Sequence, residues 1–170
     1  MTIRPETPAD LTEIYDLVKV AFETAQVSSG DEQNFVNRLR DGGNYIPGLA
    51  LVAEEDGELI GHIMLTNTSI ARDDGDFPTL LLGPISVLLE HRNKGVGSAL
   101  IQESFRLARE LGHQSAILVG NPAYYHRFGF KTTADFGIQN GNGIPDEYVM
   151  ACELVPKALD GVCGTVTFET

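Results

Sequence analysis

The chain has 170 residues, of which 42% are hydrophobic and 21% charged, and these proportions are ordinary for a folded globular protein. The net charge of −12 argues against a nucleic-acid or anionic-membrane partner, and no apolar stretch is long enough to form a transmembrane helix. Two cysteines and no signal-peptide pattern at the N-terminus predict a single cytoplasmic domain over residues 1–170.

The first half of the chain predicts two helices and four strands. One helix begins after Thr7, where a capping residue and a proline in the first turn precede apolar side chains at helical spacing. A second, shorter helix begins near Asp31 and ends before Gly42. Apolar alternation or continuous apolar runs predict strands over residues 1–4, 49–55, 58–67 and 79–88. A polar loop over residues 69–78 separates the last two strands.

The second half predicts one long helix and several short elements. The long helix spans Gly95–Leu111, with an apolar stripe on one side and Gly112 at its end. A short helix or turn is expected over residues 121–128, and a glycine-rich loop over 137–143. The predicted strands are residues 116–119, 130–133, 148–155 and 165–168. Helices mixed with strands indicate an α/β or α+β class with one central sheet.

Two glycines open the long helix, after a basic turn that follows the apolar strand. The first backbone N–H groups of a helix have no partner within it, and Gly95 and Gly97 allow an anion to approach them closely. Arg92 and Lys94 add positive charge at the same place, where charge-assisted hydrogen bonds contribute about 1.5–3 kcal/mol each. The spacing fits neither a Walker-type phosphate loop nor a dinucleotide fingerprint, which requires a glycine where Leu100 stands. The loop is therefore a candidate diphosphate site of another kind.

The pattern Arg-x-x-Gly-x-Gly over residues 92–97 resembles the coenzyme A signature of the GNAT acetyltransferase superfamily. A second stretch, Tyr-x-x-x-Gly-Phe over residues 125–130, resembles another motif of that family. One departure is visible, because Asn121 lies only four residues before Tyr125, whereas many members place an asparagine further upstream. The short helix is therefore expected to be shortened at its start. The resemblance covers about residues 2–155, and its specific motifs lie within 81–130.

This resemblance implies a single GNAT-like domain with a mixed central sheet flanked by helices. Two parallel strands, over residues 80–88 and 116–119, would splay apart around acetyl-CoA, which is the expected cosubstrate, and no metal is implied. Backbone groups of the first strand and of the glycine loop, with two residues of the second motif, would bind the coenzyme. These residues are Ile85, Ser86, Val87, Arg92, Asn93, Lys94, Gly95, Val96, Gly97, Ser98, Asn121 and Tyr125.

The resemblance also implies two catalytic groups. Tyr125 aligns with the tyrosine that protonates the departing thiolate, and a phenol suits this role because it is neutral at pH 7. The backbone N–H of Val87 would face the thioester oxygen and stabilise the oxyanion. For the neighbouring Tyr124 we favour a packing role. The general base is not identified, and we interpret the candidate acids as solvated surface residues: Glu32, Glu54, Glu55 and Glu58.

The sequence thus predicts an N-acetyltransferase that moves the acetyl group of acetyl-CoA directly to a primary amine of a small molecule or protein, without an acyl-enzyme. Loops over residues 27–46, 69–78 and 137–148 are expected to shape the acceptor site, and the acidic balance favours a cationic acceptor. The sequence does not identify the acceptor, and it does not decide whether the protein forms a homodimer. The alternatives are a non-catalytic acyl-CoA-binding sensor of the same fold and an interaction module whose glycine loop is purely structural.

Overall fold

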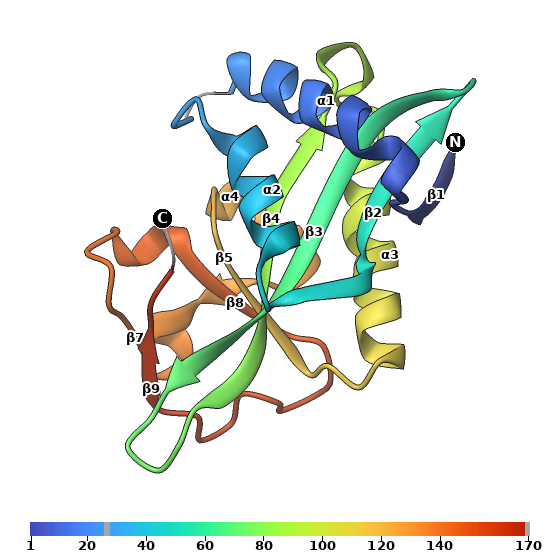
Figure 1. Ribbon diagram of the computed structural model, residues 1–170. Helices are drawn as coiled ribbons and strands as arrows, with labels where there is room; N and C mark the ends of the chain where they lie inside the picture. The colour runs from blue at the N-terminus through green and yellow to red at the C-terminus, as the bar shows by residue number, and fades with distance from the viewer. Residues whose placement is uncertain (26–27, 169–170) are drawn as a thin grey trace. The chain divides into compact units, whose positions relative to one another are not determined.

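A computed structural model describes residues 1–25 and 28–168 of the protein (Figure 1). The chain divides into two compact units, and each is described by itself. Unit 1 is formed by Met1–Thr66 and Leu82–Ala108, and unit 2 by Asn67–Leu81 and Arg109–Thr170.

The elements of unit 1 begin with a strand and two helices. They are β1 (Thr2–Pro5), a 3₁₀ turn (Pro8–Asp10), α1 (Leu11–Glu23), α2 (Glu32–Asp41), β2 (Tyr45–Glu55), the first part of β3 (Glu58–Ala71), the last part of β4 (Phe77–Val87), a 3₁₀ turn (Leu89–His91) and most of α3 (Val96–Glu110). The strands lie in the order β1-β2-β3-β4. β2 is antiparallel to both of its neighbours, and Val52 pairs with His62.

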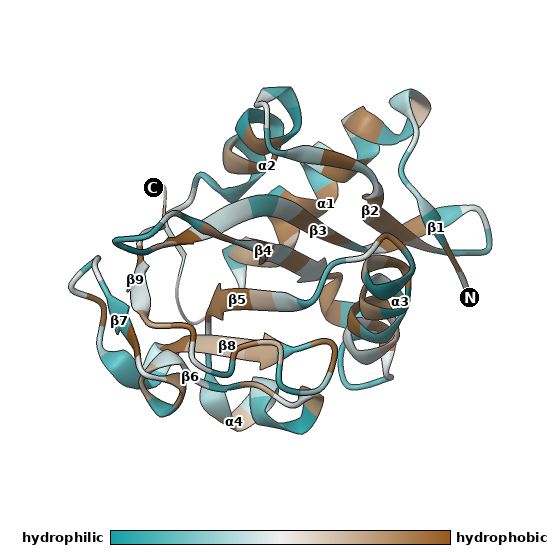
Figure 2. Ribbon diagram, turned by 90° about the horizontal axis from the view of Figure 1, so that it is seen from below, coloured by the Kyte–Doolittle hydropathy of each residue, from teal (hydrophilic) through white to brown (hydrophobic). Residues whose placement is uncertain are grey.

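Helices cover both faces of the sheet in unit 1 (Figure 2). The apolar stripe of α1 packs with Val36 of α2 on one face, where it contacts Ala50 and Val52 of β2. On the opposite face, a Cβ built on Gly61 would lie 3.0 Å from Leu100 Cδ1 and 3.1 Å from a Val96 methyl, so α3 packs closely against the β3 backbone. Full burial of one such aliphatic side chain contributes about 1.5–3 kcal/mol to stability. Because the apolar residues of each helix recur at helical spacing, they form one stripe, and this stripe is buried when the helix packs on the sheet.

Unit 2 is built mainly from short elements. They are the end of β3, the start of β4, β5 (Ser115–Val119), α4 (Pro122–Tyr125), a 3₁₀ turn (His126–Phe128), β6 (Lys131–Thr132), a 3₁₀ turn (Thr133–Phe136), β7 (Ile138–Asn140), a 3₁₀ turn (Asp146–Tyr148), β8 (Val149–Glu153) and β9 (Gly164–Val166). β4 pairs in parallel with β5 through Leu80 and Leu81, while β8 is antiparallel to β5 and β6. β9 pairs with β7 in parallel and with β3 in antiparallel orientation (Figure 1).

The predicted mixed α/β class, with a mixed sheet flanked by helices, is confirmed. Several boundaries differ from the prediction, among them the start of β2, which begins at Tyr45 and not at residue 49. The expected polar loop over residues 69–78 is shorter, because β3 continues to Ala71 and pairs with β9 through Ile70 and Val166. The glycine-rich loop over 137–143 contains β7, which also pairs with β9. Across the described part of the chain, no helix is long and apolar enough to cross a bilayer.

Candidate active site

The glycine loop between β4 and α3 lies in unit 1 and presents backbone N–H groups. Asn93 and Gly95 have positive φ angles of 61° and 84°, a region in which glycine and asparagine are the best tolerated residues. The carbonyl of Gly95 accepts the Ala99 N–H at 3.0 Å, which begins the hydrogen-bond ladder of α3. The N–H groups of residues 96–98 therefore precede the first internal donor of the helix. Donors placed in this way form an anion site.

Arg92 supports this loop through backbone contacts. The sequence suggested that its charge adds to the anion site. In the structure, Arg92 Nη2 donates to the carbonyl of Ala21 in the last turn of α1 at 2.7 Å, and Nε donates to the carbonyl of Val87 at 3.1 Å. The guanidinium thus ties the loop to α1 and to the end of β4. Lys94 is exposed on the loop.

Ile85, Ser86 and Val87 end β4 in unit 1. The Leu88 N–H donates to the Ile60 carbonyl at 2.9 Å, so the pairing with β3 extends past the end of the strand. Ser86 is only 3% exposed, and its hydroxyl has no hydrogen-bond partner among the described residues.

Tyr125 is the last residue of α4, in unit 2. Its ring packs edge-on against Tyr124, with centroids 4.9 Å apart, and against Phe130, with centroids 5.9 Å apart. A Cβ on Gly120 would overlap Cε2 of Tyr125, so this position must be glycine for the ring to lie there. Burial raises the pKa of Tyr125 to about 12, and Tyr124 adds to the rise. The phenol is therefore protonated at neutral pH and can donate a proton.

Asn121 holds the start of the same short helix. Its Oδ1 accepts the Ala123 N–H at 2.9 Å, which is the usual hydrogen bond of an N-cap residue. The sequence placed Asn121 among the coenzyme contacts, and the structure gives its side chain this capping role. As expected from the position of Asn121, α4 is short, with four residues.

Sequence reasoning missed a buried charged network in unit 1. Glu6, directly after β1, accepts hydrogen bonds from Arg40 Nε at 2.6 Å and Nη2 at 3.1 Å, and lies 2.9 Å from His62 Nε2. Burial acts to raise the pKa of Glu6, but the hydrogen bonds from His62 and Arg40 outweigh it and lower the pKa to about 2. Because the three residues come from distant segments, no local motif could have pointed to them.

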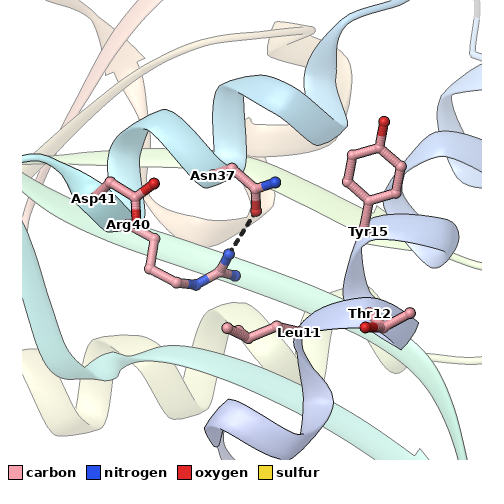
Figure 3. A pocket seen from close by; sticks show the side chains of 6 residues that line it. All are labelled: Leu11, Thr12, Tyr15, Asn37, Arg40 and Asp41. Atoms are coloured by element: carbon pink, nitrogen blue, oxygen red, sulfur yellow. Dashed lines mark hydrogen bonds between the residues drawn. The ribbon is translucent and has the colours of Figure 1, made fainter.

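Two hollows flank α1 and α2 in unit 1. One, of about 440 Å³, is shown in Figure 3, where Arg40 Nη1 donates to Asn37 Oδ1 at 2.8 Å; its lining residues are Leu11, Thr12, Tyr15, Asn37, Arg40 and Asp41. The other, of about 530 Å³, lies where α1 ends and α2 begins, and the charged residues of its lining are Lys19, Glu23 and Glu32. It overlaps the loop over residues 27–46 that was predicted to shape the acceptor site, although Val27 lies outside the described residues.

Comparison with known proteins gives the family. The sequence profile of the acetyltransferase (GNAT) domain matches residues 2–133. The chain belongs to the GNAT acetyltransferase family. The solved structure of YhbS from Escherichia coli, in complex with CoA, is 28% identical with a TM-score of 0.85, covering 99% of this chain and 89% of that one.

Two further relatives are similar to this protein over most of the chain. A GNAT family acetyltransferase from Brucella melitensis, solved in complex with acetyl-CoA, is 31% identical with a TM-score of 0.79, covering 99% of this chain and 95% of that one. The N-acetyltransferase YjhQ of Escherichia coli is 31% identical over 128 residues, which are 74% of this chain and 70% of the relative. The resemblance to GNAT acyltransferases noted in the sequence is therefore confirmed.

The residues of the GNAT motifs lie in two groups. Unit 1 brings together the end of β4, from Ile85 to Val87, and the glycine loop from Arg92 to Ser98. Unit 2 brings together Asn121 and Tyr125 on α4. The first group presents backbone donors, and the second presents a protonated phenol.

Proposed function

We propose that this GNAT protein transfers the acetyl group of acetyl-CoA directly to a primary amine, as one functional domain over residues 1–170. The observation that carries the proposal is the glycine loop, whose N–H groups at the start of α3 suit the coenzyme diphosphate. The two similar structures that contain CoA or acetyl-CoA support it. The diphosphate would rest on backbone groups from Arg92 to Ser98. The pantetheine amides would pair with Ile85, Ser86 and Val87 as an added strand does.

The chemistry follows from these groups. The neutral amine attacks the thioester carbon, and the negative charge that develops on its oxygen is stabilised by the Val87 N–H. Collapse of the intermediate expels the coenzyme thiolate, which takes a proton from the Tyr125 hydroxyl. Since an alkylammonium has a pKa of about 10.4, making the amine neutral at pH 7 costs about 4.6 kcal/mol. The reaction therefore also needs a group that removes a proton.

The acceptor that we propose is a small cationic amine. The hollow where α1 ends and α2 begins is lined by two acidic residues, Glu23 and Glu32, and one basic residue, Lys19, and the net charge of the chain is −12. Burial acts to raise the pKa of Glu32, but hydrogen bonds from Ser28, Ser29 and the Gly30 N–H lower it overall, so this carboxylate is ionised. Both cysteines are free, which is consistent with the reducing cytoplasm that we propose as its location.

Substitution of Gly97 by valine tests the coenzyme site. A branched side chain would stand beside the N–H groups at the start of α3, so we expect the dissociation constant of acetyl-CoA to rise at least tenfold, or by about 1.4 kcal/mol. The fold should persist, because α3 continues to Glu110. Isothermal titration calorimetry measures the affinity, and circular dichroism checks the fold. Unchanged affinity in a folded variant would contradict the proposed site.

The cysteines test the direct mechanism. We expect Cys152→Ala and Cys163→Ala each to retain turnover within a few-fold of the parent protein. Burial raises the pKa of Cys152 to about 11, so its sulfur is a thiol at neutral pH and a poor nucleophile. Mass spectrometry after incubation with acetyl-CoA would detect any acetyl-cysteine, and a trapped adduct on either residue would overturn direct transfer.

Thiol release separates an enzyme from a sensor. A panel of primary amines, from monoamines to polyamines, is incubated with acetyl-CoA and the protein while free coenzyme thiol is followed over time. The proposed function predicts release that depends on both the amine and the protein. A protein that binds acetyl-CoA by calorimetry but releases thiol with no amine of the panel would instead be the sensor.

A further inference from the structure

Two buried polar side chains of unit 1 stand opposite each other on neighbouring strands. β3 and β4 are neighbours and run in opposite directions (Figure 1). The hydrogen bond from Leu88 N–H to the Ile60 carbonyl sets their register, and two residues away on each strand this register places His62 opposite Ser86. A Cβ on Gly61 would lie 3.3 Å from the Ser86 carbonyl oxygen, which agrees with this register. Opposite residues share a face of the sheet, with Cβ atoms about 4.5–5.5 Å apart.

Each of these two side chains has a polar atom without a partner. His62 is 0% exposed, and its Nδ1 accepts and donates no hydrogen bond among the described residues; the same holds for Ser86 Oγ. A buried polar atom left unpaired costs about 1–3 kcal/mol. Buried waters typically satisfy such atoms by bridging polar groups of neighbouring strands or loops. The pair therefore points to a small polar ligand held between the two strands.

The Glu6 network determines which nitrogen of His62 is basic. Glu6 is ionised and can only accept hydrogen bonds, so His62 Nε2, 2.9 Å away, carries the ring proton. Nδ1, the atom without a partner, is then the ring nitrogen that can accept a further proton. Arg40 fixes the orientation of the Glu6 carboxylate by donating a hydrogen bond to each of its two oxygens.

We propose that a water molecule bridges His62 Nδ1 and Ser86 Oγ, and that His62 acts through this water as the general base of the acetyl transfer. The inference rests on the proposed function, since it supplies the proton acceptor that this reaction needs. Ser86 directly precedes Val87, whose N–H is the proposed oxyanion donor. Glu6 and Arg40 are positioning residues, which fix the tautomer and the orientation of the ring.

The proton balance of the step is simple. The ammonium group of the acceptor gives one proton to the water, and the water gives one of its own protons to His62 Nδ1. The products are a neutral amine, a water molecule and an imidazolium whose Nε2–H remains bonded to Glu6. The Glu6 carboxylate, whose Oε1 lies 2.9 Å from Nε2, compensates the charge of this imidazolium.

Substitution of His62 by glutamine tests the inference. The glutamine amide can still donate to Glu6 but has no basic nitrogen. With ethylamine as acceptor, we expect turnover to fall by about 10²-fold and the acetyl-CoA dissociation constant to stay unchanged. With trifluoroethylamine, which is already largely neutral at pH 7, the loss should be less than about threefold. A merely structural role would lower both rates equally, and that result would overturn the proposal.

A variant of Ser86 tests the other partner of the water, and variants of a second buried serine and a second histidine serve as controls. Ser86→Ala should lower turnover of ethylamine by about tenfold, because the bridging water loses one partner. Ser104→Ala removes another buried hydroxyl, one that is already bonded to the Ile101 carbonyl at 2.8 Å, and should leave turnover unchanged. His113→Gln, at a half-buried histidine of unit 2, should also be neutral. Equal losses in Ser86→Ala and Ser104→Ala would contradict a specific role for Ser86.

Nitrogen-15 NMR of the resting protein gives a readout that does not depend on activity. The spectrum at pH 7 should show His62 protonated on Nε2 and bare on Nδ1, with the His62→Gln variant providing the assignment. A ring protonated on Nδ1 would overturn the inference and leave the proposed function intact. If the native protein acetylates ethylamine and His62→Gln does so equally well, only the inference falls. If the native protein acetylates no amine, the proposed function is wrong, and so is the role of His62 as its general base.

Discussion

Replacement of Tyr125 by phenylalanine is expected to lower turnover by about 10²–10⁴-fold while the dissociation constant of acetyl-CoA changes little. The substitution removes only the hydroxyl and keeps the ring, which packs against Tyr124 and Phe130 over Gly120. If the hydroxyl protonates the leaving thiolate, the lost interaction is made chiefly in the transition state, so the rate falls and binding does not. Steady-state kinetics together with calorimetric titration of acetyl-CoA measure the two quantities.

Tyr124→Phe is the control for this experiment. The Tyr124 ring contacts the Arg127 guanidinium, 4.8 Å from its centroid, and the Phe128 ring at 5.4 Å, so its role is packing and the variant should be mild. A severe loss in Tyr124→Phe with a mild one in Tyr125→Phe would mean that the motif is one residue out of register. Two mild variants would mean that the proton comes from solvent.

Replacement of Glu6 by alanine should destabilise the protein by about 3–5 kcal/mol, the usual cost of removing one partner of a buried ion pair. The change leaves the buried His62 without its acceptor and Arg40 without the carboxylate that binds it at 2.6 Å. Urea denaturation followed by circular dichroism gives the free energy of unfolding of both proteins. Because the pKa of Glu6 lies at about 2, below the ordinary 4.5, its contribution is present at neutral pH and is lost as the pH falls from 4.5 towards 2.

Glu55→Ala is the matched surface control. This carboxylate is 43% exposed, and its partners, the N-terminal amine and His91, lie 3.9 and 3.7 Å away. Exposed pairs of this kind contribute about 0–1 kcal/mol, so the variant should unfold almost as the native protein does. If Glu6→Ala were no more harmful than Glu55→Ala, the buried network would have no stabilising role.

Local patterns could predict much of the fold. The apolar spacing after Thr7 and the glycines on either side of Val96 locate α1 and α3, and both properties belong to a few consecutive residues. Asp56 and Gly57, the two residues between the predicted strands over 49–55 and 58–67, are also typical of a hairpin turn, and they adopt positive φ angles of 52° and 79°. Family membership could be inferred for the same reason, since each GNAT motif occupies a short continuous segment.

Features that depend on distant partners could not be predicted. β7 is a three-residue strand in a glycine-rich segment, and only its pairing with β9 makes it a strand. The sequence indicated the charge of Arg92 but not its bond to the carbonyl of Ala21, 71 residues earlier. Similarly, His62 lies 56 residues from Glu6, and nothing in the spacing of the four histidines pointed to a carboxylate.

The bond from Arg92 to α1 has a consequence for attempts to redesign acceptor preference. Exchanging the segment that joins α1 and α2 for that of another acetyltransferase is an obvious strategy, since it borders the larger hollow. The last turn of α1 supplies the Ala21 carbonyl that holds Arg92, however, and Arg92 in turn supports the glycine loop. A graft that unwinds this turn would weaken coenzyme affinity even though the loop itself is unaltered. Splice points should therefore lie after Glu23, the last residue of the helix.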